Sequence, residues 1–234
     1  INLYAVWSAN TYTIKFDGNG AEGSMIDQER VYDDQEAISN NLFSKVGYTF
    51  DGWKLEDNTY ENRYVGNLSS TNEDVITLVA KWKEHTYKVV FNANNGSSDS
   101  VEQEFTYTEK IAVVKVLNEI LKADNIAHEK EIEYLNDVIF SFDFDENYKA
   151  EINSLITLQA LSTIREMIVD KKAMVAQMMG RMIVIDKDIN YNEVKLYNAF
   201  CESCNIEKDF NTEDYPEYTL SGPFVNPEDL MDIM

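Results

Sequence analysis

Cysteine, proline and histidine are all scarce in this chain of 234 residues, which has two cysteines, three prolines and two histidines. No apolar run approaches the roughly 18 to 20 residues that a transmembrane helix requires, so this segment is not expected to insert into a membrane. No basic-then-apolar leader opens the chain. The content of 44% hydrophobic and 12% aromatic residues, with so little proline, is typical of a chain that folds.

Basic residues are also few: the chain has 20 lysines and arginines but 42 aspartates and glutamates, which gives a formal net charge of -22. The acids are spread along the whole length. Such a field repels phosphate backbones and anionic lipid, which argues against nucleic acid as a partner. The composition instead predicts a protein partner or host receptor with a basic surface.

The sequence lacks the usual signatures of an enzyme. His85 and His128 lie outside any recognisable catalytic triad signature, and no Walker loop, HExxH or GxSxG motif occurs. A hydrolase with paired carboxylates stays an alternative, because any acidic chain contains candidate pairs. We expect no catalytic residues and a function other than catalysis.

The two cysteines, Cys201 and Cys204, form a CxxC pair within a helical pattern. Such a pair can be redox-active, metal-binding or simply buried. Two cysteines without a second pair make no zinc site, and acidic neighbours oppose the thiolate that redox chemistry needs. Burial is the favoured interpretation.

An internal repeat of 75 residues runs through the first half of the chain. Residues 1–7 (INLYAVW) return as 76–82 (ITLVAKW), and residues 12–20 return as 87–96. Four landmark pairs keep the constant offset: Leu3 and Leu78, Trp7 and Trp82, Tyr12 and Tyr87, Phe16 and Phe91.

Within one period, apolar and polar residues alternate in strand fashion over residues 12–16, 28–32, 48–53 and 75–82. Residues 35–45 instead show helical spacing, so the predicted order is ββαββ. The aromatic residues at strand positions are expected to fill a small core, with a ligand-stacking face as the alternative. They are Trp7, Trp53, Trp82, Phe16 and Phe50.

Three segments of residues 1–107 read YTIKFDGNGAEGSM, GYTFDGWKLEDNTY and ITLVAKWKEHTYKVVFNANNG. They resemble the Listeria/Bacteroides repeat, also called the internalin B-repeat. The resemblance implies a β-grasp-like unit, placement in an extracellular array on a bacterial cell surface, and a role as spacer or weak receptor-binding module. It carries over no catalytic residues.

The predicted fold class is α+β, a β-grasp-like (ββαββ) surface repeat followed by a separate all-α helical bundle. We expect the opening residues to come from a longer polypeptide, and the truncated hairpin to pack on the helices through Val89, Phe91 and Phe105. The predicted parts are the last strand of a preceding repeat (1–9), a complete repeat (10–84), a truncated repeat hairpin (85–108), an acidic helical bundle (109–207) and a tail (208–234).

The second half has helical stripes that predict five or six helices and no strand. Its methionines at helical spacing are expected to fill the core, with an adaptable partner groove as the alternative. They are Met167, Met174, Met178, Met179 and Met182.

Two similar turns occur in this half, one leading from Asp124 through Ile126 to Glu129 and one from Asp186 through Ile189 to Glu193. In this pattern residues 110–206 resemble the tellurite-resistance TerB-like helical domain. The resemblance implies an acidic-clefted domain linked to metal stress or membrane-associated complexes through partners.

Alternate oxygen ligands in the second turn resemble part of a cation-binding loop. The candidate ligands for weakly bound calcium or magnesium are Asp186, Asp188, Asn190 and Glu193, with Asp124 and Glu129 from the first turn. The alternative is that Asp188 or Asn190 caps the next helix while Glu193 favours its dipole. No other cofactor is expected.

Together these patterns predict a non-catalytic adhesion or interaction protein of the bacterial cell surface, in which repeats present a helical domain. The alternative is a TerB-like cation-binding or stress-response module carried on a repeat stalk, which would be cytoplasmic if the helical domain decides the location.

Overall fold

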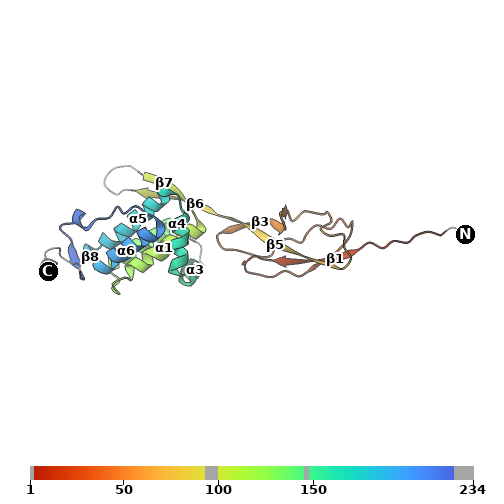
Figure 1. The fold of residues 1–234 in the computed structure, drawn as a ribbon, viewed down its shortest axis with the longest axis horizontal. Coiled ribbons are helices and arrows are strands. Elements are labelled where there is room, and N and C mark those ends of the chain that lie inside the picture. Colours follow the sequence, from red (N-terminus) through yellow and green to blue (C-terminus); the bar gives the residue numbers. More distant parts are fainter. Residues whose placement is uncertain (1–2, 93–99, 145–147, 224–234) are drawn as a thin grey trace, which may run out of the picture. The chain divides into compact units, whose positions relative to one another are not determined.

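The computed structural model describes residues 3–92, 100–144 and 148–223 (Figure 1). The chain divides into two compact units, Ile1–His85 and Thr86–Met234. The first is built on a sheet and the second on six helices, which confirms the predicted α+β class. None of the helices among the described residues is both long and apolar enough to span a bilayer.

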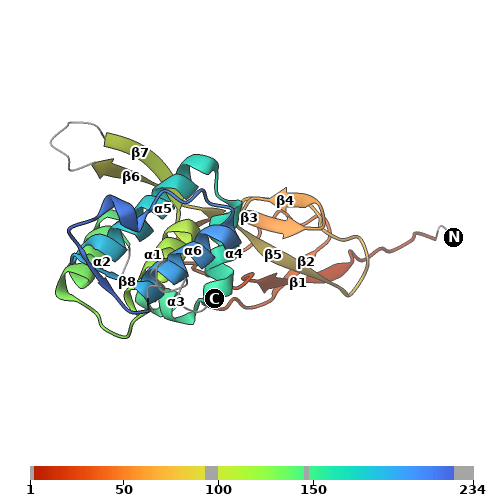
Figure 2. The same cartoon turned by 60° about the vertical axis from the view of Figure 1, so that its left-hand side comes forward.

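The repeat unit holds one five-stranded sheet, with its strands labelled in Figure 2. The strands are β1 (Thr11–Asp17), β2 (Gln28–Val31), β3 (Tyr48–Leu55), β4 (Asn58–Tyr60) and β5 (Asp74–Glu84). Their order across the sheet is β2-β1-β5-β3-β4. The last strand in sequence is therefore the central one, parallel to β1 and antiparallel to β3.

The core of the repeat unit forms on the face to which the alternating apolar residues point. Trp53 is fully buried, and its ring lies 4.9 Å from Phe16, 4.9 Å from Phe50 and 6.2 Å from Phe43. Its position confirms the prediction that Trp53 belongs to the core. The buried residues of this cluster are Tyr12, Ile14, Ile38, Trp53, Leu78 and Ala80.

The other two tryptophans lie in different surroundings. Trp82 is half-buried at the edge of this core, as are Phe16 and Phe50, and its indole Nε1 donates to the Gly18 carbonyl at 2.9 Å. Trp7 is almost fully exposed, so its assignment to the core is wrong for this chain. Residues 3–9 form no strand either, because no neighbouring strand pairs with them.

The helix predicted over residues 35–45 is also wrong: this segment, all of it described, is an extended connection. Side chains form hydrogen bonds with the backbone N–H and C=O groups that a helix would pair with each other. Gln28 accepts from Ser39 N and donates to Ala37 O, both at 2.9 Å, while Asn41 exchanges two hydrogen bonds with the Phe43 backbone. Such local bonds compete with helix formation. The repeat unit is therefore a sheet without a helix, and the ββαββ order is not observed.

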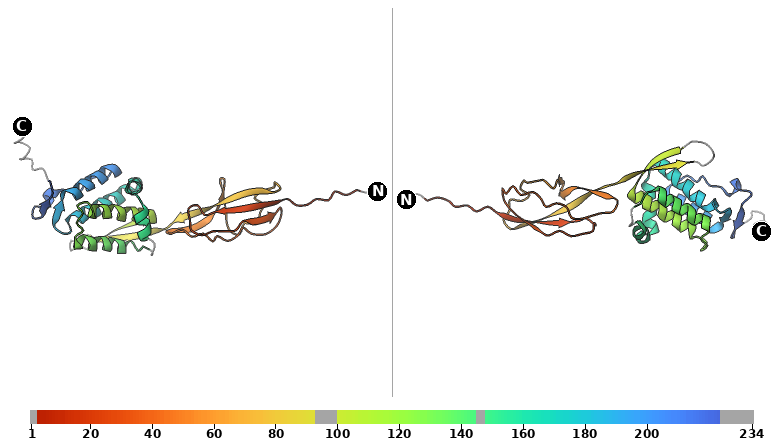
Figure 3. Two further views of the ribbon diagram at one scale, coloured as in Figure 1. Left: turned by 90° about the horizontal axis from the view of Figure 1, so that it is seen from below. Right: turned by 180° about the vertical axis from the view of Figure 1, so that it is seen from behind.

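The described residues of the helical unit form six helices, within the predicted range of five or six, and Figure 3 shows them from two sides. They are α1 (Tyr107–Leu121), α2 (Glu129–Ser141), α3 (Tyr148–Ser154), α4 (Thr157–Glu166), α5 (Val169–Val184) and α6 (Tyr191–Cys204). Helix α1 is apolar on most sides and contacts each of the other five, so it is the central helix. All five methionines named above are buried, which confirms core filling.

A hairpin of β6 (Thr86–Asn92) and β7 (Ser100–Thr106) belongs to the helical unit. Val89 and Phe105 are buried, and the Phe105 ring lies 5.7 Å from that of Phe142. The side chain of Phe91 lies outside the described residues. The hairpin is thus packed on the bundle, as the sequence predicts.

Lys110 of α1 joins the hairpin to the helices. It is fully buried, its Nζ donates to the Phe142 carbonyl at 2.6 Å, and it lies 3.1 Å from the centroid of the Tyr87 ring and 4.7 Å from that of Phe144. A buried ammonium is tolerated only with such partners, because desolvating an unpaired charge is costly. The aromatic rings around Lys110 therefore connect β6 to α1 and to the segment after α2.

The hairpin has the same strand register as the opening hairpin of the repeat unit. Tyr12 faces Arg30 and Thr13 faces Glu29 in the first hairpin, and Tyr87 faces Phe105 and Lys88 faces Glu104 in the second. Every one of these positions is shifted by 75 residues. At Thr106, however, the chain enters α1 through a capping box with Glu109. The truncated repeat ends at a helix start.

Removing the hairpin is expected to destabilise the helices, because Lys110 and Phe142 would lose their buried partners. A chain that begins at Glu109 should melt well below the full chain when ellipticity at 222 nm is followed. A Lys88→Ala variant is the matched control, since Lys88 is exposed and forms an exposed ion pair with Glu102. Equal melting of the shortened and full chains would show that the hairpin is an independent linker.

The described part of the tail after α6 packs on the helical unit. Phe210 packs on Tyr197 with centroids 5.6 Å apart, and a short strand, β9 (Thr219–Ser221), pairs in parallel with β8 (Asp188–Asn190). The expectation of no strand in this half is therefore wrong. Both strands are short, and each needs the distant other to form. Residues 224–234 of the predicted tail lie outside the described residues.

Candidate acidic site in the helical unit

The turn between α1 and α2 is stabilised by hydrogen bonds that its own acidic side chains accept from the backbone. Asp124 Oδ1 accepts from Ile126 N at 2.8 Å. His128 then caps α2, with Nδ1 accepting from Lys130 N at 3.3 Å, while Glu131 Oε2 accepts from His128 N at 2.7 Å. An Asp turn therefore leads into a capped helix with a glutamate at its third position.

The turn between α5 and α6 repeats this arrangement. Asp186 Oδ1 accepts from Asp188 N at 2.9 Å, and Asn190 Oδ1 accepts from Asn192 N at 2.8 Å and caps α6. Glu193 again occupies the third helical position. Asp124 and Glu131 are seven residues apart, as are Asp186 and Glu193, and the two pairs are separated by 62 residues.

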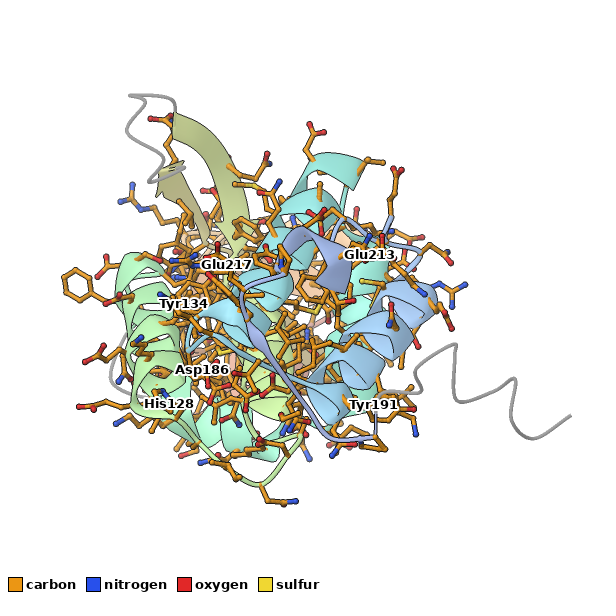
Figure 4. All side chains as sticks on the ribbon, turned by 90° about the vertical axis from the view of Figure 1, so that its left-hand side faces the viewer. His128, Tyr134, Asp186, Tyr191, Glu213 and Glu217 are labelled. Carbon is orange, nitrogen blue, oxygen red and sulfur yellow. The ribbon has the colours of Figure 1, made fainter. Side chains whose placement is uncertain are left out.

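The two turns lie together in space. Asn190 Nδ2 donates to Asp124 Oδ2 at 3.3 Å and to Ser221 Oγ at 3.1 Å, so it joins the first turn, the second turn and β9. In Figure 4, His128 of the first turn and Asp186 of the second appear on the same side of the unit. Four carboxyl groups thus converge: Asp124, Glu131, Asp186 and Glu193.

Glu131 and Glu193 form the buried centre of this acidic cluster, each only 3% exposed. Burial raises the pKa of Glu193 to about 9, and the neighbouring charges of Glu131, Asp124 and Asp186 act in the same direction. Burial also raises the pKa of Glu131, which is partly offset by the hydrogen bonds that it accepts from His128 N and Glu193. At neutral pH Glu193 is therefore the protonated partner and donates to the Glu131 carboxylate.

The structure brings together most of the predicted cation ligands, but not all. Asp124, Asp186, Asn190 and Glu193 meet as described, while Glu129 is exposed on the first turn of α2. Asp188 lies in β8 and does not contribute to the raised pKa of Glu193.

Glu131 is the functional candidate that sequence reasoning missed. Its signal was the spacing of seven residues from Asp124, equal to that between Asp186 and Glu193. The capping alternative is correct for Asn190. Within the described ranges, no three or more His, Cys, Asp or Glu side chains are grouped so as to hold a metal ion. The calcium or magnesium site stays a prediction.

The cysteine pair is buried and free, in keeping with the favoured interpretation. Burial raises the pKa of Cys201 to about 11 and also raises that of Cys204, whose Sγ donates to Leu161 O at 3.4 Å. Redox chemistry needs a thiolate, which these environments disfavour.

Comparison with known proteins identifies the first unit. Residues 12–81 form a Listeria-Bacteroides repeat domain, which confirms the predicted recognition over the complete repeat. The TerB-like resemblance of residues 110–206 stays a prediction.

Two similar proteins come from Evansella cellulosilytica. One, named "Putative Gly-rich membrane protein", is 33% identical over 108 residues, which is 44% of this chain and 12% of the relative. Another, named "Putative membrane protein", is 35% identical over 109 residues, or 46% of this chain and 16% of the relative. The chain thus spans a small part of either relative. The repeat and these names agree with a surface-associated protein.

A solved structure of a protein of unknown function from Porphyromonas gingivalis W83 is also similar, at 23% identity and a TM-score of 0.40. The match covers 47% of this chain and 91% of that chain.

Proposed function

We propose that this chain is a non-catalytic interaction segment of a bacterial surface protein, in which the repeat unit acts as a spacer and the helical unit meets the partner. The observation that supports the proposal is the joining of a Listeria-Bacteroides repeat to a compact unit of a different fold. A spacer needs a core of its own, and the repeat unit has one around Trp53. The net charge of -22 favours a partner with a basic surface.

The proposal is tested by binding of labelled protein to a panel of bacterial and mammalian cells, read by flow cytometry. The full chain is compared with residues 1–85 and residues 86–234, divided at the boundary between the two units. Binding is expected to survive in residues 86–234 and to weaken as salt is added. Binding by residues 1–85 alone would assign the interaction to the repeat, and no binding by any of the three would reject adhesion.

A second candidate function, binding of a hard cation, is favoured by the acidic cluster alone. Oxygen ligands from two turns are the kind that calcium and magnesium use. A cation would have to compete with the proton shared by Glu131 and Glu193. Affinity would therefore be weak and would rise with pH.

Millimolar calcium is expected to raise the melting temperature of the helical unit by mass action if the second candidate is right. The test is calorimetry at pH 8 on the wild type and on the double variant Asp186→Asn/Glu193→Gln, which removes the charge of Asp186 and the carboxyl group of Glu193 as possible ligands. The control is Glu213→Gln, a change in the tail. Equal shifts in all three proteins would indicate diffuse screening of the acidic chain instead of a site.

A further inference from the structure

Arg30 is a charged side chain in the interior of the repeat unit. It belongs to β2, is only 1% exposed and lies directly across from the buried Tyr12 of β1. A guanidinium keeps its charge under all ordinary conditions, so Arg30 cannot reduce the cost of burial by losing a proton. Folded proteins normally pair a buried charge with a carboxylate and satisfy its remaining donors with hydrogen bonds.

The surroundings of Arg30 supply only part of what its guanidinium requires. Nη2 donates to Asp34 O and to Val65 O, both at 3.3 Å. Nε and Nη1 are buried as well, but they have no hydrogen-bond partner among the described residues. The two bonds that do form are long and end on neutral carbonyl groups, so they do not balance the charge.

The acidic side chains next to β2 do not pair with Arg30. Asp33 is exposed and accepts from Asn67 Nδ2 at 2.8 Å, while Asp34 is exposed and offers Arg30 its carbonyl group. In the part of the chain that the structure describes, no ion pair joins Arg30 to a carboxylate. A chain with 42 acids thus leaves its buried arginine without a counter-charge. The counter-charge must come from outside the protein.

A second buried polar group lies on the connection between β4 and β5, which also supplies Val65 O. The amide oxygen of Asn62 has no hydrogen-bond partner among the described residues. Rotation of an amide exchanges its oxygen and nitrogen, so Asn62 can accept from a water or donate to an anion. Buried groups of this kind usually mark a bound water or ion.

We propose that the repeat unit binds one chloride ion at Arg30, which accepts hydrogen bonds from Nε or Nη1. A halide fits best because it is close to a water molecule in size, whereas the carboxylate of a partner cannot reach a side chain buried this deeply. Water could accept the same bonds but would leave the charge unbalanced. The bound ion would let Arg30 hold the turn at Asp34 and the connection at Val65 against β2. This inference is independent of the proposed function.

The test is thermal unfolding of the full chain, followed by tryptophan fluorescence, because all three tryptophans lie in the repeat unit. Chloride is raised from about 5 to about 200 mM by replacing gluconate, an anion too large to enter, at constant sodium. Screening of the acidic surface is then the same in every sample. We expect the melting temperature to rise by about 4 °C or more, following mass action for one site.

Arg30→Met is the variant that removes the site, and Arg63→Met is its matched control, because Arg63 is an exposed arginine on the connection between β4 and β5. The chloride effect should be lost in the first variant and kept in the second. Should Arg30→Met fail to fold, wild-type crystals grown in sodium bromide decide the matter. A bromine anomalous peak is expected within hydrogen-bond distance of Arg30 Nε or Nη1.

Three results would overturn the inference. One is a melting temperature that is the same in chloride and in gluconate. Another is a chloride effect that persists in Arg30→Met. The third is a water at Arg30, in place of bromide, in the crystals.

Discussion

Raising the pH from 5 to 8 is expected to destabilise the helical unit. Glu193 has a pKa of about 9 in the folded chain, against an ordinary value of 4.5, so between these values the folded state binds a proton that the unfolded state has released. The contribution of Glu193 to the free energy of unfolding is fully present below about pH 4.5 and is lost as the pH rises towards 9. The expected slope is roughly 1.4 kcal/mol per pH unit for one proton.

The measurement is urea unfolding followed at 222 nm, a signal from the helical unit because the described repeat unit contains no helix. The matched variant is Glu193→Gln, whose amide can still donate to Glu131 but takes up no proton. Its unfolding free energy should change far less between pH 5 and 8. If wild type and variant show the same pH dependence, the Glu131–Glu193 pair does not share a proton as described.

Trp53→Ala is expected to cost the repeat unit about 3 to 5 kcal/mol, the range for truncating a large buried aromatic side chain. The change leaves a cavity among Phe16, Phe43 and Phe50, all of which contact the indole ring. All three tryptophans lie in the repeat unit, so the fluorescence of Trp82 reports its unfolding without interference from the helices.

Trp53→Phe is the control for this prediction. The buried Nε1 of Trp53 has no hydrogen-bond partner among the described residues, so phenylalanine loses no hydrogen bond and keeps much of the ring. Its cost should be clearly smaller than that of alanine. Unchanged melting of Trp53→Ala, together with lost binding to a ligand, would instead assign Trp53 to a recognition surface.

Local pattern was enough to predict most strands and all six helices, because alternation and helical spacing depend on near neighbours in sequence. It failed over residues 35–45, where apolar spacing alone favours a helix. There, Gln28 bonds to the backbone from a separate strand, and the sequence gives no sign of that partner. Strand β9 was missed for the same reason, since it exists only by pairing with β8.

The acidic site was predicted in part for a related reason. Each turn was visible from its spaced acids, and the sequence named Asp124, Asp186 and Glu193, three of the four carboxyl groups that converge. Choosing between Glu129 and Glu131 required knowing which side of α2 faces the second turn. That side is set by the packing of α1, α2 and α5, which no local spacing determines.

The parallel pairing of β1 and β5 also decides how the repeat responds to mechanical force. The chain enters the repeat at the start of β1 and leaves it at the end of β5, which lie at opposite ends of the ladder joining these two strands. Tension along the chain therefore shears the ladder. Its six paired positions, from Tyr12 and Asp74 to Asp17 and Val79, carry the load together instead of separating one at a time. A repeat with this topology should extend abruptly, at a force set by the rupture of the whole ladder.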